Sequence, residues 1–278
     1  AVSGRVAYDR EGSLRFFWIG NNTQQADETN YLQKTIGYFW RVGLPIFRDS
    51  KWKFNFAHRL SGEKIDNGVF DTLPGIRDRF PEYSADHFHQ DSEFQLFIDY
   101  DTRDSALTTS EGSYLKFLIE NARPGFGGEF TFQRYGIDMR HFHRWDDEGS
   151  MITALRYKFE QVLGSAPFYL LPSLGGRTVH RAYGRGRYVD KGLATVTLEQ
   201  RIIVYKIKVA GVTTELELTP FMGLGTVFAA PKHMARRYMR PVFGGAVRAI
   251  ARPQVVGSID IGVGQEGPAV FMDINYSF

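Results

Sequence analysis

The chain has 278 residues, enough for one large domain or two small ones, and its 34 lysines and arginines nearly balance 31 aspartates and glutamates. A net charge of +3 is too small to indicate a nucleic-acid-binding protein, and the absence of cysteine excludes disulfides, thiolate metal sites and covalent haem attachment. Phenylalanine (23), tyrosine (14) and glycine (29) favour strands and tight turns over helices. No run of 18 apolar residues predicts a transmembrane helix, although a membrane-spanning strand needs only about ten residues of alternating pattern.

Apolar and polar residues alternate along twelve segments, as they do in strands with one apolar and one polar face. The first segment sets Leu14, Phe16 and Trp18 against Ser13 and Arg15. The predicted strands are 13–20, 35–42, 52–60, 95–101, 113–121, 129–141, 150–160, 193–206, 214–228, 242–250, 254–263 and 268–278. No long helical pattern separates them, which excludes the α/β classes. Residues 1–12 are left as a separate N-terminal segment, either a short extension or a plug, and 13–278 form the domain.

Two all-β architectures fit this alternation: a soluble sandwich, with apolar faces towards a core, and a transmembrane barrel, with apolar faces towards lipid. The connections favour the barrel because long and short ones alternate along the chain. The longer ones are 20–33, 61–90, 122–128, 162–192 and 229–240; the short ones are 44–50, 102–112, 144–149, 207–212 and 251–253, with 264–267 short where a longer one is due. The sequence therefore predicts a transmembrane antiparallel β-barrel of about 12 strands, with long extracellular loops and short periplasmic turns.

A basic, glycine-rich loop precedes the most regular strand. The loop, SLGGRTVHRAYGRGRYVDK (173–191), has neither a helical nor a strand period, so it cannot bury an apolar face of its own. The strand at 193–206 alternates strictly and places Glu199 and Arg201 on its polar face. In a barrel that polar face lines the lumen.

Several segments resemble the barrel domain of the BamA/TamA family of outer-membrane assembly and translocation proteins. They are IDYDTRDSALTTSEGSYLKF (98–117), the basic loop with the strand after it, TPFMGLGTVF (219–228) and the closing YSF. The resemblance covers about residues 94–278 and implies a location in the outer membrane of a Gram-negative bacterium. It also implies surrounding lipid and lipopolysaccharide, and other outer-membrane or periplasmic proteins as partners. The chain is expected to be a shortened member, because fewer strands than in the family precede the loop, and to be without POTRA domains, because no βααβ pattern occurs in the sequence.

The resemblance also implies a lock between the long loop and the lumen wall. The family loop carries an aliphatic residue, arginine, glycine and an aromatic residue, which here match His180, Arg181, Ala182 and Tyr183. Arg181 and Tyr183 are accordingly expected to dock inward, so that residues 162–192 fold towards the lumen. The matching wall residues are Glu199 and Phe221, while the family's second acidic position is occupied by Gly223. The loop is therefore expected to dock with one anchor fewer.

Two further sets of residues are candidates for function. Charged residues on polar strand faces are expected to fill the lumen and neutralise one another, with an anion-selective pore as the alternative; they are Arg134, Arg156, Lys158, Arg201, Glu215 and Glu217. The alternating end of the chain, with Ile274, Tyr276 and Phe278, resembles the C-terminal recognition signal of bacterial outer-membrane barrels.

The sequence offers no catalytic constellation, and we expect neither an enzyme nor a cofactor. His87-Phe88-His89 and His141-Phe142-His143 have a spacing that metals can use, but solvated polar residues are the favoured interpretation, so no metal site is predicted. The expected function is outer-membrane protein insertion or translocation, through a weakly paired seam between strands 13–20 and 268–278. The alternative is a non-catalytic structural or conduit subunit of an outer-membrane complex.

Overall fold

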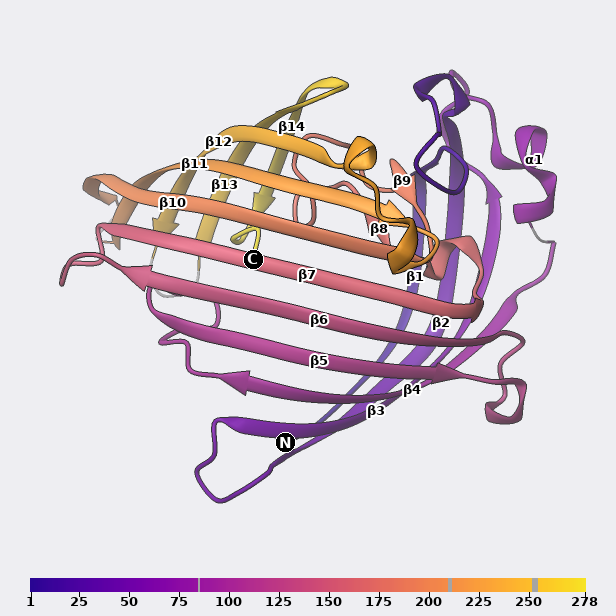
Figure 1. Cartoon of the computed structure of the whole chain (residues 1–278), viewed down its shortest axis with the longest axis horizontal. Coiled ribbons are helices and arrows are strands. Elements are labelled where there is room, and N and C mark those ends of the chain that lie inside the picture. Colours follow the sequence, from indigo (N-terminus) through magenta and orange to yellow (C-terminus); the bar gives the residue numbers. More distant parts are fainter. Residues whose placement is uncertain (85, 210–211, 252–254) are drawn as a thin grey trace.

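A computed structural model describes residues 1–84, 86–209, 212–251 and 255–278. Twelve antiparallel strands form one continuous sheet in the order β1-β2-β3-β4-β5-β6-β7-β10-β11-β12-β13-β14 (Figure 1). The strands are β1 (Val2–Phe16), β2 (Thr29–Pro45), β3 (Trp52–Asn67), β4 (His89–Asp101), β5 (Gly112–Ala122), β6 (Thr131–Arg144), β7 (Met151–Ser165), β10 (Gly192–Val209), β11 (Val212–Phe228), β12 (Arg240–Ala251), β13 (Val255–Gly264) and β14 (Gly267–Ile274). Each of the twelve predicted strands overlaps one strand of this sheet, although the bounds of the first and last differ from the prediction.

Other regular structure is short. Strands β8 (Ser173–Leu174) and β9 (Tyr188–Val189) pair with each other inside the connection between β7 and β10. The helical turns are α1 (Ile76–Arg79), η1 (Gln25–Asp27), η2 (Pro81–Tyr83), η3 (Pro124–Phe126), η4 (Phe168–Leu170), η5 (Pro231–His233) and η6 (Arg236–Tyr238). Within the described residues, none of these is a helix of the length and apolarity needed to cross a bilayer.

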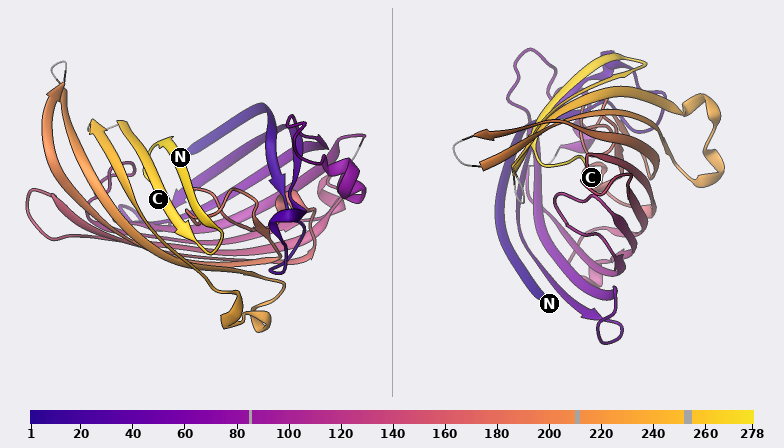
Figure 2. Two further views of the ribbon diagram at one scale, coloured as in Figure 1. Left: turned by 90° about the horizontal axis from the view of Figure 1, so that it is seen from above. Right: turned by 90° about the vertical axis from the view of Figure 1, so that its left-hand side faces the viewer.

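The sheet curls round on itself (Figure 2). Its charged side chains are buried on the inner face and its large apolar side chains are exposed on the outer face. Ile119 is 50% exposed and Ile261 49%, whereas the charged Glu199 and Arg248 are both fully buried. This distribution is the reverse of a soluble protein and is that of a barrel whose outer face meets lipid. It excludes the sandwich that the alternation alone left open.

The first strand differs from its prediction. β1 begins at Val2 and pairs with β2 from Val2–Val42 through to Phe16–Thr29, with a register shift between Glu11 and Leu14. Residues 2–12 are therefore part of the barrel wall rather than a separate segment, and 17–20 lie in the following connection. The prediction was wrong because a ladder of backbone hydrogen bonds defines this strand, whereas its side chains alternate only weakly.

The long connections lie at one end of the barrel and the short ones at the other, as expected. The long end carries 17–28, 68–88, 123–130, 166–191 and 229–239, and also the short 265–266. Residue 85 in the long loop expected at 61–90, and parts of the turns expected at 207–212 and 251–253, lie outside the described residues. β3 and β4 extend further than predicted, which shortens the loop between them.

Strands β1 and β14 are the two edges of the sheet. In the described part of the chain β1 pairs only with β2 and β14 only with β13, so the barrel has a seam at which the two edges do not pair. Residues 166–191 run on the inner side of the sheet, where Leu174 and Tyr183 pack against Phe221 and Val242. We call this connection the inner loop.

Candidate functional site

Four strands place charged side chains on one patch of the inner wall. Glu199 and Arg201 are two residues apart on β10 and therefore share a face; Glu217 of β11 lies directly opposite Arg248 of β12. Arg248 donates to Glu217 Oε1 at 2.9 Å and to Glu199 Oε2 at 3.4 Å, and Arg201 donates to Glu199 Oε2 at 3.1 Å. Asp260 of β13 completes the group, 3.5 Å from Arg248 Nη2. We call these five residues the wall cluster.

The inner loop docks on the wall cluster through Arg181. Its Nη2 lies 2.6 Å from Glu199 Oε1, its Nη1 donates to Asp260 Oδ1 at 3.0 Å, and its guanidinium stacks 3.6 Å from the centre of the Phe221 ring. Arg181 is 3% exposed, so a counter-charge is required to offset its loss of hydration. Glu199 and Asp260 provide it, and the Phe221 ring adds a cation–π contact.

Tyr183 fixes the other side of the same turn. Its ring stacks on His180 with centroids 5.5 Å apart, and its hydroxyl accepts a hydrogen bond from the backbone N–H of Gln265 at 3.1 Å. It belongs to the same buried cluster as Phe221. The structure thus brings together all four residues proposed as a lock: Arg181, Tyr183, Glu199 and Phe221.

The expectation that the loop lacks its second acidic anchor was wrong. Asp260, from β13, occupies that role, although the position matched by sequence is Gly223 on β11. At Gly223 a Cβ would already approach Val242 Cγ1 to 3.0 Å and the Val196 carbonyl to 3.1 Å, so a side chain there would crowd the wall. The sequence showed Asp260 on a polar strand face, but alternation does not reveal which inward residue meets the loop.

Two wall glycines make room for the inner loop at Arg181 and Ala182. A Cβ at Gly262 would lie 1.8 Å from the Arg181 carbonyl, and one at Gly264 would lie 2.8 Å from the Ala182 Cβ. Both distances are impossible for real atoms, so the loop backbone approaches β13 only because these residues lack side chains.

Arg177 is a second loop arginine that sequence reasoning did not single out. Its Nε donates to Asp260 Oδ2 at 3.0 Å and its Nη1 to Asp273 Oδ2 of β14 at 3.2 Å. Its Nη2 donates to the backbone carbonyl of Asn275. One side chain of the inner loop therefore joins β13, β14 and the residues that follow β14.

Residues 275–278 turn into the lumen and do not continue β14. Asn275 has φ +134°, a backbone conformation outside the strand region, and the chain turns inward there. Tyr276 Oη donates to Glu217 Oε2 at 2.9 Å, Ser277 Oγ donates to Glu199 Oε1 at 2.6 Å, and Arg201 Nη2 donates to the Phe278 carbonyl at 3.2 Å. We call this segment the C-terminal tail.

The tail changes the interpretation of the proposed C-terminal signal. Ile274 is 65% exposed on the outer face as expected, but Tyr276 and Phe278 lie on the inner side. The placement of those two residues on the lipid face was wrong. The carboxylates of Glu199 and Glu217 lie on the inner side of the sheet. The hydroxyls of Ser277 and Tyr276 can donate to them only if the tail turns inward.

The remaining predicted lumen charges are each close to an opposite charge. Arg134 lies 2.9 Å from Glu120, Arg156 lies 2.8 Å from Asp138, Lys158 lies 2.7 Å from Glu160, and Glu215 lies 3.6 Å from Lys206. Arg201 and Glu217 belong to the wall cluster. This pairing favours a neutralised filling over a row of unpaired cations for selecting anions.

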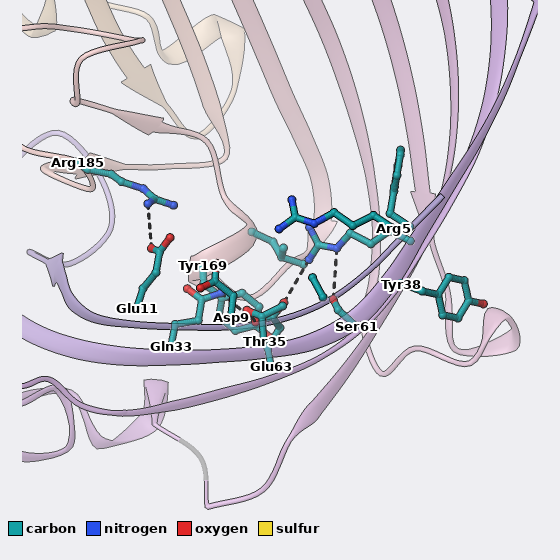
Figure 3. A pocket seen from close by; sticks show the side chains of 15 residues that line it. Arg5, Asp9, Glu11, Gln33, Thr35, Tyr38, Ser61, Glu63, Tyr169 and Arg185 are labelled. Carbon is teal, nitrogen blue, oxygen red and sulfur yellow. Dashed lines mark hydrogen bonds and ion pairs between the residues drawn. The ribbon is translucent and has the colours of Figure 1, made fainter. Parts of the chain in front are cut away.

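A cavity of about 370 Å³ remains between the inner faces of β1 to β3 and the inner loop (Figure 3). Both signs of charge line it, including Arg5, Asp9 and Glu63, and Arg185 of the loop donates to Glu11 at 2.9 Å across it. The lumen is thus packed on the β10–β14 side and partly open beside β1.

The histidine pairs lie away from this site and differ from each other. His89 bonds Glu129 Oε2 through Nδ1 at 2.8 Å, and ligand atoms of His87, His89 and Glu129 lie within 4.8 Å of one another. The backbone N–H of Gln90 also donates to Glu129 at 2.8 Å, so these hydrogen bonds account for the position of the carboxylate. His141 contacts Ser113 Oγ at 2.9 Å.

Residues 2–250 match the sequence model of the Omp85 superfamily domain. The chain belongs to the Omp85 superfamily. The predicted family resemblance is thereby confirmed, and the chain is an outer-membrane β-barrel protein of a family that inserts and translocates proteins, in Gram-negative bacteria or organelles of similar origin.

Among solved structures, the fold is similar to the crystal structure of BamA from Haemophilus ducreyi lacking POTRA domains 1–3. The TM-score is 0.65 at 14% sequence identity, and the alignment covers 99% of this chain but only 57% of the BamA chain. A comparison with curated proteins gives no match.

Proposed function

We propose that this Omp85 barrel takes part in inserting proteins into, or translocating them across, the outer membrane of a Gram-negative bacterium. The observation that carries the proposal is the seam: β1 and β14 are both edge strands, and among the described residues they do not pair with each other. An edge strand presents a row of backbone N–H and C=O groups that can pair with an incoming strand. Such templating needs neither a catalytic side chain nor a cofactor.

The wall cluster supports this role by holding one side of the seam. Arg177 and Arg181 bind Asp260 of β13, and Arg177 also reaches Asp273 of β14. These contacts fix the last strands to the inner loop. An incoming strand would therefore meet a positioned β14 edge, while the β1 side borders the open cavity.

Site-directed cross-linking tests the proposal, because the natural chain has no cysteine. Met272→Cys places a thiol on β14, where Met272 is 73% exposed, and Met139→Cys is the matched control on β6, in the middle of the sheet, where Met139 is 47% exposed. Each variant is placed in liposomes with an unfolded barrel client that carries one cysteine in its last strand. Disulfides to the client are expected from position 272 and not from position 139.

The alternative function predicts a different outcome. If the chain is a structural or conduit subunit, liposomes containing it will not accelerate client folding, position 272 will cross-link no more than position 139, and stable partner proteins will co-purify. That combination would reject the insertion role.

A further inference from the structure

The connection between β11 and β12 is a second basic loop, besides the inner loop. Residues 229–239 read AAPKHMARRYM, with Lys232, His233, Arg236 and Arg237 in eleven positions. The sequence contains no aspartate or glutamate between Glu217 and Asp260. The positive charge of this loop is therefore not balanced locally along the chain.

The structure leaves these charges in solvent. Turns η5 and η6 shape the loop, and Lys232, His233, Arg236 and Arg237 are all exposed. In the described part of the chain no ion pair involves Lys232, Arg236 or Arg237, whereas most arginines of the lumen have carboxylate partners. His233 interacts electrostatically with Asp190. Lys232, Arg236 and Arg237 are therefore the three cations of this loop that have no carboxylate partner among the described residues.

The loop projects away from the lumen. Figure 2 shows it in orange, extending outward from the rim of the barrel on the outer side of β10 and β11. Beneath it the outer faces of β11 and β12 are apolar, with Met222 51% and Phe243 60% exposed. Met234 and Tyr238 add apolar atoms among the cations. This rim carries the long connections, so in a bilayer the loop would lie at the level of the lipid headgroups.

We propose that Lys232, Arg236 and Arg237 bind the phosphate groups of lipopolysaccharide in the outer leaflet. Lysine and arginine bind phosphate through charge-assisted hydrogen bonds, and each such residue near an anionic leaflet strengthens attachment. Lipopolysaccharide is the anionic lipid of the leaflet that the long loops of a bacterial outer-membrane barrel face. The inference depends on the proposed Gram-negative location and orientation, but not on insertion activity.

The test measures lipid binding to the full folded chain in detergent micelles, using lipid A with two phosphates as the probe. The variant Lys232→Gln/Arg236→Gln/Arg237→Gln removes three cations. The control Arg48→Gln/Lys51→Gln/Lys208→Gln removes three exposed cations from strand ends and turns at the opposite rim. The loop variant is expected to bind at least about tenfold more weakly, and the control to bind like the natural chain.

Two further ligands test whether the loop recognises the two phosphates of lipid A or any anionic lipid. Lipid A with one phosphate is expected to bind the natural chain several-fold more weakly than the diphosphorylated form, and phosphatidylglycerol, a single-phosphate phospholipid, more weakly again.

Equal binding of the loop variant and the natural chain would overturn the proposal, as would equal losses in both triple variants. Phosphatidylglycerol binding as tightly as lipid A would reject lipopolysaccharide as the ligand, and loss of a co-purifying acidic protein with unchanged lipid binding would assign the loop to a protein partner.

Because none of the three loop side chains has an ion-pair partner among the described residues, the variant is expected to fold. Retention of the compact, heat-modifiable band on electrophoresis confirms folding before binding is measured. If the lipid-binding test contradicts this proposal, the proposed insertion activity is unaffected, because cross-linking from position 272 does not involve residues 229–239.

Discussion

At the scale of single residues, the lumen is organised by buried charges with several partners each. Glu199 contacts Arg181, Arg201 and Arg248, and Asp260 contacts Arg177, Arg181 and Arg248. Alternation along β10 was sufficient to place Glu199 inside. It was not sufficient to identify Asp260 as an anchor, because that depends on where a loop without any periodicity crosses the wall.

Asp260 and Asp273 both bind Arg177, but replacing each of them should lower the stability of the barrel by very different amounts. The Asp260 side chain is fully buried, whereas that of Asp273 is 53% exposed. Asp260→Ala leaves buried guanidinium groups short of a counter-charge and is expected to lower the free energy of unfolding by about 3–5 kcal/mol. Asp273→Ala is expected to cost less than about 1 kcal/mol. Urea unfolding of the two variants in lipid vesicles measures both; equal losses would show that Asp260 is not an anchor.

At the scale of elements, the last strand is shorter than its sequence pattern. Apolar residues continue at every second position to Phe278, yet β14 ends at Ile274 and the tail turns inward. A period of two describes which residues would share a face if the strand continued. It contains no information about the turn at Asn275 or about the carboxylates of Glu199 and Glu217 that bind the tail inside.

Thiol labelling distinguishes the two orientations of the chain end. In the cysteine-free chain, Ile274→Cys should react readily with a lipid-soluble maleimide, because position 274 is on the outer face. Phe278→Cys should react at least about tenfold more slowly, because the Phe278 ring lies inside, with the guanidinium carbons of Arg156 and Arg201 both 5.8 Å from its centre. Labelling is followed by mass spectrometry of the folded protein in bilayers. Comparable rates at both positions would place the tail on the lipid face instead.

At the scale of the whole molecule, the strand number and the asymmetry of the two ends could be predicted from the sequence. Twelve alternating segments and alternating connection lengths are local properties, and the structure reproduces both. The family resemblance implied a weakly paired seam, but the alternation of the strands could not show whether the two edges pair at all. Whether β1 and β14 pair depends on the curvature accumulated over all strands, which no single segment determines.

The filled lumen predicts a barrel that conducts ions poorly. The inner loop packs Leu174 and Tyr183 against the wall, and Arg156 donates to the Thr178 carbonyl of the loop at 2.8 Å. In planar bilayers the natural chain should show low conductance, and deletion of residues 177–186 should raise it severalfold by emptying the β10–β14 side. Arg185→Ala is the control, because it removes a loop charge whose side chain is 70% exposed. A natural chain that conducts as well as the deletion variant would refute the plugged lumen.

The close approach of Arg181 and Ala182 to the two wall glycines couples two segments that are distant in the sequence. The Ala182 methyl group lies against Gly264, whereas the backbone carbonyl of Arg181 lies against Gly262. Gly264→Ala should be tolerated better with glycine at position 182 than with alanine, because a Cβ at 264 would lie 2.8 Å from the Ala182 Cβ. Gly262→Ala should gain nothing from that change, because its Cβ would lie 1.8 Å from the backbone carbonyl of Arg181. The side chain that β13 can carry at position 264 is therefore set by the residue that the inner loop carries at position 182.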